Sequence, residues 1–399
     1  MGQFKRASII FCLIISISSA QQGSEKTWNK KMQNLYQTLT SLMTDISSDQ
    51  KFNTPANFKR IEENTKTFAE LAHDISGITR DGKTASGEKI EAPDSDPSIP
   101  MIAALFSDDT KRAYEALKSG HRDYARSILR TVTGYCVGCH SRNNKGPDFA
   151  KLSEKPEVKA LTKLEHAEFF AATRQHDKAV SEFESIIADT NTIQNRPLEW
   201  EKAIRYALAI SVRVKKDPDL ALKIVNKILE PKDAPTFIRD YATIWKTSIQ
   251  DWLKESSRKL MTEEGLYAES MRLIAKAKDT QRYPADRSAD IYFLRVSSLI
   301  HDMLHISPDG PNSANGLLLL GISYEALRDL NLWSLHEFFY EACVRKAPHT
   351  DTARTCYKHY EQSMYQGYSG SGGFAIPKDV KMKLKELEGI ASNETKKPQ

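Results

Sequence analysis

The chain has little of several features that mark common classes of protein. Only five of the 399 residues are cysteines. The chain has 57 basic and 52 acidic residues, so its net charge is only +5. So weak a charge balance argues against a nucleic-acid partner. Beyond the first 20 residues no apolar run approaches the roughly 20 residues that a membrane-spanning helix needs. The remainder has the composition of an ordinary globular protein, with 40% hydrophobic and 27% charged residues.

The amino-terminal stretch has the three parts of an export signal. Lys5 and Arg6 are followed by an apolar stretch over residues 7–17, and small residues then lead to Ala20. This order predicts a signal peptide over residues 1–20 that is removed after export. An uncleaved anchor is disfavoured because the apolar run is too short to span a bilayer. We therefore expect a periplasmic protein of a bacterium, with no stable membrane insertion after cleavage.

One short motif carries the strongest chemical signal. The run Cys136-Val137-Gly138-Cys139-His140 is the C-x-x-C-H pattern of covalent c-type haem attachment. Two thiols at this spacing can join the two vinyl groups of one porphyrin, and the histidine can ligate the iron. A thioredoxin-like redox pair would need a βαβ setting, and a zinc site would need a second Cys or His pair at finger-like spacing, which the sequence lacks. The motif occurs once, so we expect one covalent haem c.

The remaining cysteines can be assigned by counting. Cys12 leaves with the signal peptide, and Cys136 and Cys139 are assigned to the haem. Cys343 and Cys356 remain, and an even pair in an exported chain predicts a disulfide. This bond would join two helices. Two buried free thiols are the alternative.

The amino-terminal third predicts a helical bundle around the motif. Apolar residues recur at steps of three and four over four segments, at about 24–46, 54–78, 101–118 and 122–140. A long surface loop is expected over 81–100, where Gly, Ser, Asp and Pro dominate. Both motif cysteines fall on the apolar face of the fourth helix. The prediction is a four-helix bundle in up-down-up-down order that encloses the haem.

Residues 24–142 resemble the cytochrome c-prime class and its noncovalent b-type relative. In the c-prime class the attachment motif lies near the carboxyl end of the fourth helix, as Cys136 to His140 do here. The b-type relative uses a methionine near the start of its first helix as second axial ligand, with apolar residues at the next turns, and Met32, Leu35 and Leu39 repeat that arrangement. The resemblance implies His140 as proximal and Met32 as distal iron ligand. The long loop after the second helix departs from both groups.

Met32 is not the only candidate for the distal position. His73, Met101 and His121 are each expected near the haem end of the bundle. Met32 can also be ordinary core filling over a five-coordinate iron, because methionine is a common gap-filler.

The rest of the chain predicts helix pairs. Ala167, Phe170, Ala179 and Phe183 fit the small and aromatic positions of a tetratricopeptide repeat. Leu317-x-x-Leu320-Gly321-x-x-Tyr324 fits its best-known signature, apart from leucine in place of tryptophan. Residues 151–368 therefore resemble a degenerate tetratricopeptide array, with a generic helical bundle as the alternative. Such repeats leave a concave face for a protein or peptide.

Together these features predict an all-α chain with four parts. Residues 1–20 are the signal peptide, 21–150 the haem domain, 151–368 the repeats and 369–399 a flexible tail. We expect an electron carrier whose repeats dock a redox partner, and not a catalyst. A gas-binding or sensor protein with an open sixth iron position is the alternative. A peroxidase is disfavoured because this sequence shows no distal catalytic pair. His301 and His305 share a helical face but have no evident third ligand, so we expect surface or core histidines.

Overall fold

The computed structural model describes residues 27–84, 86–89, 96, 98–142, 149, 155–255, 262–328, 334–371 and 373–392. The predicted signal peptide lies outside these residues. The protein is all-α, as predicted. Within the described ranges the sheet consists of one short antiparallel pair, β1 (Ser369–Gly370) and β2 (Gly373–Phe374). No helix in those ranges combines the length and the apolar character needed to cross a membrane.

Two compact units make up the chain. The first holds the described residues that fall within 27–89, 99–135 and 149–162, and the second holds 96–98, 136–142 and those from 163 onward. This division differs from the predicted boundary at residue 150, because Cys136, Cys139 and His140 belong to the second unit. The contacts of His140 and Arg142, described below, bind this segment to the helices of that unit.

The first unit contains the first three helices predicted from the sequence. Its elements are a helix over residues 27–46, α2 (Asp49–Phe52), η1 (Pro55–Asn57), α3 (Phe58–Asp81), α4 (Ser98–Lys118), α5 (Arg122–Leu129) and α7 (Pro156–Lys159). Leu35 and Leu39 are buried, as are Phe68 and Ile75 of α3, so the apolar stripes face the core as their period requires. Gly82 ends α3 in a left-handed conformation, with φ of 66°, which glycine adopts without steric cost.

The predicted fourth helix is broken in the structure. It consists of α5 and α6 (Thr133–His140), with a turn between them. In that turn the Thr131 hydroxyl donates to the Ile128 carbonyl at 2.7 Å, so a side chain takes up a carbonyl at the end of α5. Thr131, Val132 and Thr133 are also three successive β-branched residues, which fit a helix interior poorly. The prediction of one continuous helix was therefore wrong at this point.

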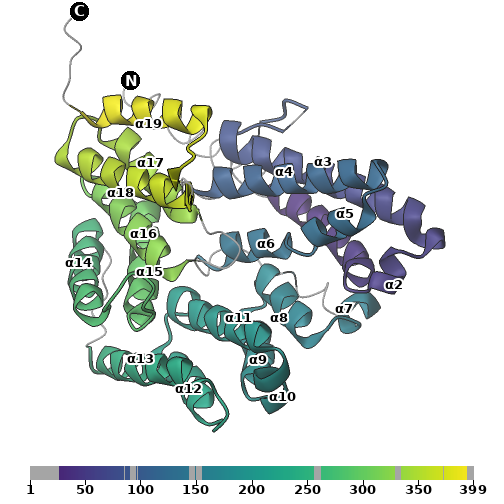
Figure 1. The fold of residues 1–399 in the computed structure, drawn as a ribbon, viewed down its shortest axis with the longest axis horizontal. Coiled ribbons are helices and arrows are strands. Elements are labelled where there is room, and N and C mark those ends of the chain that lie inside the picture. The colour runs from purple at the N-terminus through teal and green to yellow at the C-terminus, as the bar shows by residue number, and fades with distance from the viewer. Residues whose placement is uncertain are drawn as a thin grey trace, which may run out of the picture. The chain divides into compact units, whose positions relative to one another are not determined.

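The second unit is an array of helices in which most successive members pack against each other (Figure 1). Its elements after the motif are α8 (Lys163–Ala172), α9 (His176–Ile187), α10 (Thr190–Asn195), α11 (Pro197–Leu208), η3 (Ala209–Val214), α12 (Pro218–Leu229), α13 (Thr236–Lys254), α14 (Glu263–Thr280), α15 (Asp290–Ile306), α16 (Ser313–Leu327), α17 (Leu335–Lys346), α18 (Asp351–Gly367) and α19 (Lys378–Ala391). This repeat-like arrangement agrees with the predicted helix pairs.

Small residues face large ones between the paired helices. Gly321 of α16 lies directly against the Tyr340 ring of α17, where an added methyl group would overlap the ring. In the α8–α9 pair, the residues picked out by the repeat pattern, Ala167, Phe170, Ala179 and Phe183, are all buried. Close approach at a small residue therefore sets the packing of α16 on α17.

Two further predictions concern the carboxyl-terminal part. Cys343 of α17 and Cys356 of α18 form a disulfide with a Cα–Cα distance of 6.2 Å, which confirms the predicted bond. The prediction of a flexible tail from residue 369 was wrong, because α19 packs on α17 and α18. Its buried residues Leu384, Leu387 and Ala391 recur at steps of three and four, the period of a helix with one apolar face.

Candidate functional site

The short helix α6 holds all three residues of the predicted haem motif. Neither Cys136 nor Cys139 takes part in a disulfide, and His140 is the last residue of the helix. Residues three and four apart lie on one side of a helix, so both thiols and the imidazole share a face. Cys136 and His140 are buried, and Cys139 is partly exposed.

The His140 ring is fixed by a backbone carbonyl. Its Nδ1 lies 2.6 Å from the carbonyl oxygen of Ala172, and because a carbonyl can only accept, Nδ1 carries the proton. The other ring nitrogen, Nε2, then has a lone pair. Histidines that bind metals are held in this way, by a hydrogen bond from the nitrogen that does not bind the metal.

The position of Ala172 explains why this carbonyl is available. Ala172 is the last residue of α8, and carbonyl groups in the last turn of a helix have no partner within the helix. The chain then turns into α9 through Arg174, which has a left-handed backbone with φ of 59°. Burial and the charge of Arg174 lower the pKa of His140 to about 3, with a smaller contribution of the same sign from His176, while the hydrogen bond with the Ala172 carbonyl opposes the shift. The imidazole is therefore neutral at pH 7.

A buried ion pair holds the segment that follows the motif. Arg142 is only 1% exposed, its Nε donates to the Gly138 carbonyl at 3.1 Å, and it donates to Asp96 at 2.8 Å. The carboxyl end of α6 is thus bound to a carboxylate within the core of the second unit. Breaking such a pair leaves a buried charge without a partner of opposite sign, which is strongly unfavourable.

His301 of α15 joins the same cluster. Its Nδ1 lies 2.9 Å from the Asp96 carboxylate, and its Nε2 lies 2.8 Å from the Tyr324 hydroxyl. Burial alone would raise the pKa of Asp96, but Arg142 and His301 lower it far below its usual range. Asp96 is therefore an anion, and His301 is a core histidine, one of the two roles expected for it from the sequence.

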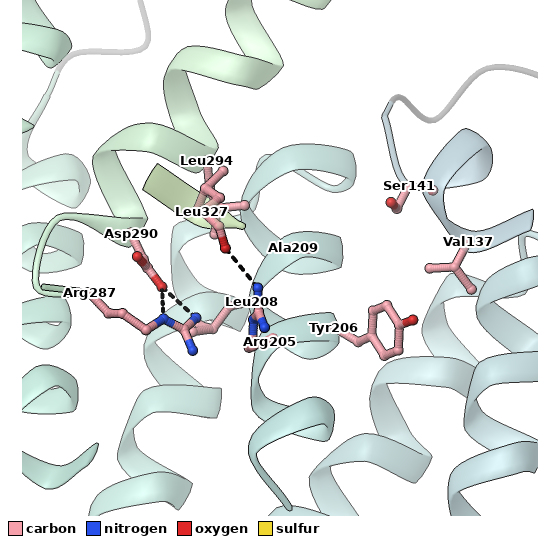
Figure 2. A pocket seen from close by; sticks show the side chains of 11 residues that line it. Val137, Ser141, Arg205, Tyr206, Leu208, Ala209, Arg287, Asp290, Leu294 and Leu327 are labelled. Carbon is pink, nitrogen blue, oxygen red and sulfur yellow. Dashed lines mark hydrogen bonds and ion pairs between the residues drawn. The ribbon is translucent and has the colours of Figure 1, made fainter. Parts of the chain in front are cut away.

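A π-helix lies near the side of α6 that faces away from Cys136, Cys139 and His140. The helix α11 continues into η3, a π-helix, a rare conformation that is frequently found at functional sites. With Val137, Gly138 and Ser141, the residues Leu208 and Ala209 line a cavity of about 30 Å³, the size of a water site. Figure 2 shows Arg205 reaching the Leu327 carbonyl and Arg287 reaching Asp290 at the far side of this cavity.

The other predicted ligand lies in the first unit. Met32 belongs to the helix over residues 27–46, and its side chain is partly exposed. Its role as distal ligand stays a prediction. Of the alternatives, Met101 is buried, whereas His73 and His121 are exposed.

One residue of this region was missed by the sequence analysis. His176, the first residue of α9, is 5% exposed, and neither of its ring nitrogens has a hydrogen-bond partner among the described residues. No motif or apolar period marks it, because it follows a turn and is the only histidine in its helix. Only the tertiary structure brings it close to His140.

This chain matches no protein-family model, no curated protein and no solved structure. Within the described ranges, no three His, Cys, Asp or Glu side chains gather as a set of metal ligands. The assignment of the motif therefore depends on its own residues and their surroundings.

Proposed function

We propose that the protein is an exported c-type cytochrome that holds one haem c through Cys136 and Cys139, with His140 on the iron. The hydrogen bond from His140 Nδ1 to the Ala172 carbonyl carries this proposal. It places the proton on the nitrogen that an iron ligand does not use and leaves Nε2 as the donor. When bound, the haem supplies one-electron transfer.

The residues around the motif fit this role. The two thiols lie one helical turn apart on α6, as attachment to one porphyrin requires. The neutral state of His140, which burial enforces, is the state that binds iron. The Arg142–Asp96 pair holds the end of the same helix, so the ligand is oriented by a rigid surrounding structure.

Electron transfer without bond chemistry is the activity that we infer, and the protein is then a carrier and not an enzyme. The helix array of the second unit would dock a redox partner protein or peptide, as stacked helix pairs do in general. Export is supported by the amino-terminal signal pattern and by the Cys343–Cys356 disulfide, since such bonds persist in oxidising compartments. In a bacterium that compartment is the periplasm.

Mass spectrometry of the mature protein tests the proposal. The chain is expressed in a host with haem-maturation machinery, and its intact mass is measured before and after acid-acetone extraction. One haem should remain bound, because thioether bonds survive this treatment. The variant Cys136→Ala/Cys139→Ala should carry none, whereas Cys343→Ser/Cys356→Ser, a matched change of two cysteines, should keep it. A wild-type mass without haem would refute the proposal.

A further inference from the structure

The first unit contains an open cleft with a volume of about 570 Å³, which falls within the roughly 300–1,000 Å³ of small-molecule sites. Every residue that lines it is polar: Ser41, Thr44, Asp45, Lys51, Asn57, Arg60 and Asn64. Small-molecule sites are usually lined by apolar and aromatic side chains. An all-polar lining therefore indicates a ligand that is itself polar over most of its surface.

The lining residues recur at helical spacing on the two sides of the cleft. The helix over residues 27–46 contributes Ser41, Thr44 and Asp45, which are three and four residues apart. Helix α3 contributes Arg60 and Asn64, which are four residues apart. Residues at these steps share one face of a helix. Two polar helix faces therefore meet at one cleft, and α2 and η1 connect them.

A fixed ion pair lies in the cleft. The Asp45 side chain is only 3% exposed, and Arg60 donates to its two oxygens at 2.6 and 2.8 Å. Arg60 also donates to the side-chain oxygen of Asn57 at 3.1 Å, and the Asn57 amide donates to the Lys51 carbonyl at 2.9 Å. This continuous chain of hydrogen bonds fixes one wall of the cleft across α3, η1 and α2. A ligand would therefore meet a preformed surface, which lowers the entropic cost of binding.

Three other lining side chains keep their hydrogen-bonding capacity. Among the described residues, the Thr44 hydroxyl, the Lys51 ammonium and the Asn64 amide have no hydrogen-bond or ion-pair partner. A hydroxyl and an amide each donate and accept, whereas an ammonium only donates. Saccharide hydroxyls also donate and accept, so each of them can be satisfied in this lining.

The charges of the lining select among polar ligands. Asp45 and Arg60 neutralise each other, which leaves Lys51 as the uncompensated charge. One positive charge favours a ligand with one negative charge. The Arg60 guanidinium is already bound in bidentate fashion by Asp45, so the fork that phosphate groups prefer is not available. A carboxylate is the better match.

We propose that this cleft is a binding site for a sugar acid, a saccharide that carries one carboxylate. The carboxylate pairs with the Lys51 ammonium, and ring hydroxyls bond to Thr44 and Asn64. This inference goes beyond the proposed function and needs no haem, because all the residues that carry it belong to the first unit.

Saturation-transfer NMR of the mature full-length protein tests the proposal with three probes. D-Glucuronate has the ring hydroxyls and the carboxylate, D-glucose has the hydroxyls alone, and acetate has the carboxylate alone. Glucuronate should bind, and glucose should bind about fivefold more weakly, the factor expected for the loss of one exposed ion pair. Acetate should show no saturation transfer.

Variants of the lining assign the binding to this cleft. Lys51→Ala should weaken the binding of glucuronate about fivefold and leave that of glucose unchanged, since only the carboxylate meets the ammonium. Thr44→Val, which is nearly isosteric, should weaken the binding of both sugars about fivefold through the loss of one hydrogen bond. Asn64→Leu should abolish both, because an apolar side chain then occupies the site of the amide. Lys278→Ala removes an exposed lysine of α14 in the second unit and should change neither.

Several results would overturn the inference. Glucuronate that does not bind the wild type would do so, as would binding that survives both Lys51→Ala and Thr44→Val unchanged in variants whose circular dichroism matches the wild type. Equal affinity for glucose and glucuronate would remove the role of the carboxylate. Acetate that binds as well as glucuronate would reduce the cleft to a nonspecific anion contact. None of these results bears on the covalent haem, which the intact mass tests separately.

Discussion

Nε2 of His301 and the hydroxyl of Tyr324 lie 2.8 Å apart in the core of the second unit. The Nδ1 of the same ring faces the Asp96 carboxylate at 2.9 Å, so the neutral imidazole donates to the carboxylate and accepts from the phenol. Both hydrogen bonds fix one tautomer. A second proton on the ring would remove the acceptor that Tyr324 uses.

This arrangement predicts a pH dependence of stability. Burial lowers the pKa of His301, and Arg142 and Arg213 lower it too, although Asp96 opposes them. In the unfolded chain the group titrates near its ordinary value of about 6.5, so below that pH the unfolded state binds the extra proton. Stability is therefore present at higher pH and is lost as the pH falls below about 6.5.

Urea unfolding between pH 5 and 8 measures this effect. His301→Gln keeps a donor and an acceptor but has no proton to gain, so its free energy of unfolding should fall less steeply with decreasing pH. The difference in slope should approach 1.4 kcal/mol per pH unit below pH 6. Identical slopes for the wild type and the variant would contradict the prediction. Asp96, Arg142, Arg213 and Tyr324 face this ring and should be left intact in both proteins.

Asp96→Asn should be strongly destabilising. The side chains of Asp96 and Arg142 are only 6% and 1% exposed, so the substitution leaves a buried guanidinium without its carboxylate. Loss of one partner of a buried pair costs about 3–5 kcal/mol. Asp309→Asn is the matched control, because the Asp309 side chain is 86% exposed where it pairs with Lys346, and surface pairs contribute about 0–1 kcal/mol. Equal effects of the two changes on chemical denaturation would argue against a tight cluster.

Gly321→Ala tests the packing of α16 on α17. The new methyl group would meet the Tyr340 ring, which is fully buried and stacked on His359 with centroids 5.0 Å apart. Because the ring has no room to move, the cost should be about 1–3 kcal/mol. Gly389→Ala in α19 meets nothing within 4 Å and should instead stabilise by about 0.5–1 kcal/mol through helix propensity. Thermal unfolding of both variants distinguishes the two signs.

Local patterns predicted most of the helices, because the apolar period of a helix can be read within a short segment. The disulfide was predicted from the number of cysteines left over in a chain expected to be exported. Local patterns failed where a weak local signal competed with packing. The break after Leu129 depends on a threonine hydroxyl that takes a carbonyl, and α19 depends on a surface supplied by α17 and α18. At the site, the motif residues were evident from spacing alone. Neither the Ala172 carbonyl nor the buried His176 carries a sequence signal, because the contact of the one with His140 and the burial of the other arise only in the folded chain.

The Cys343–Cys356 disulfide allows a test of whether stability at the carboxyl-terminal end of the second unit can change without affecting the motif at its amino-terminal end. The bond joins α17 to α18 across a sequence separation of 13 residues, so Cys343→Ser/Cys356→Ser should cost about 3 kcal/mol on the chain-entropy estimate. The expected result is a lower midpoint of chemical denaturation with an unchanged haem spectrum, because neither cysteine lies in the motif or in the α8–α9 turn. A reducing agent should lower the wild-type midpoint by the same amount and should leave the variant unaffected. A wild type that does not respond to reduction would mean that the two sulfurs are not bonded in the mature protein.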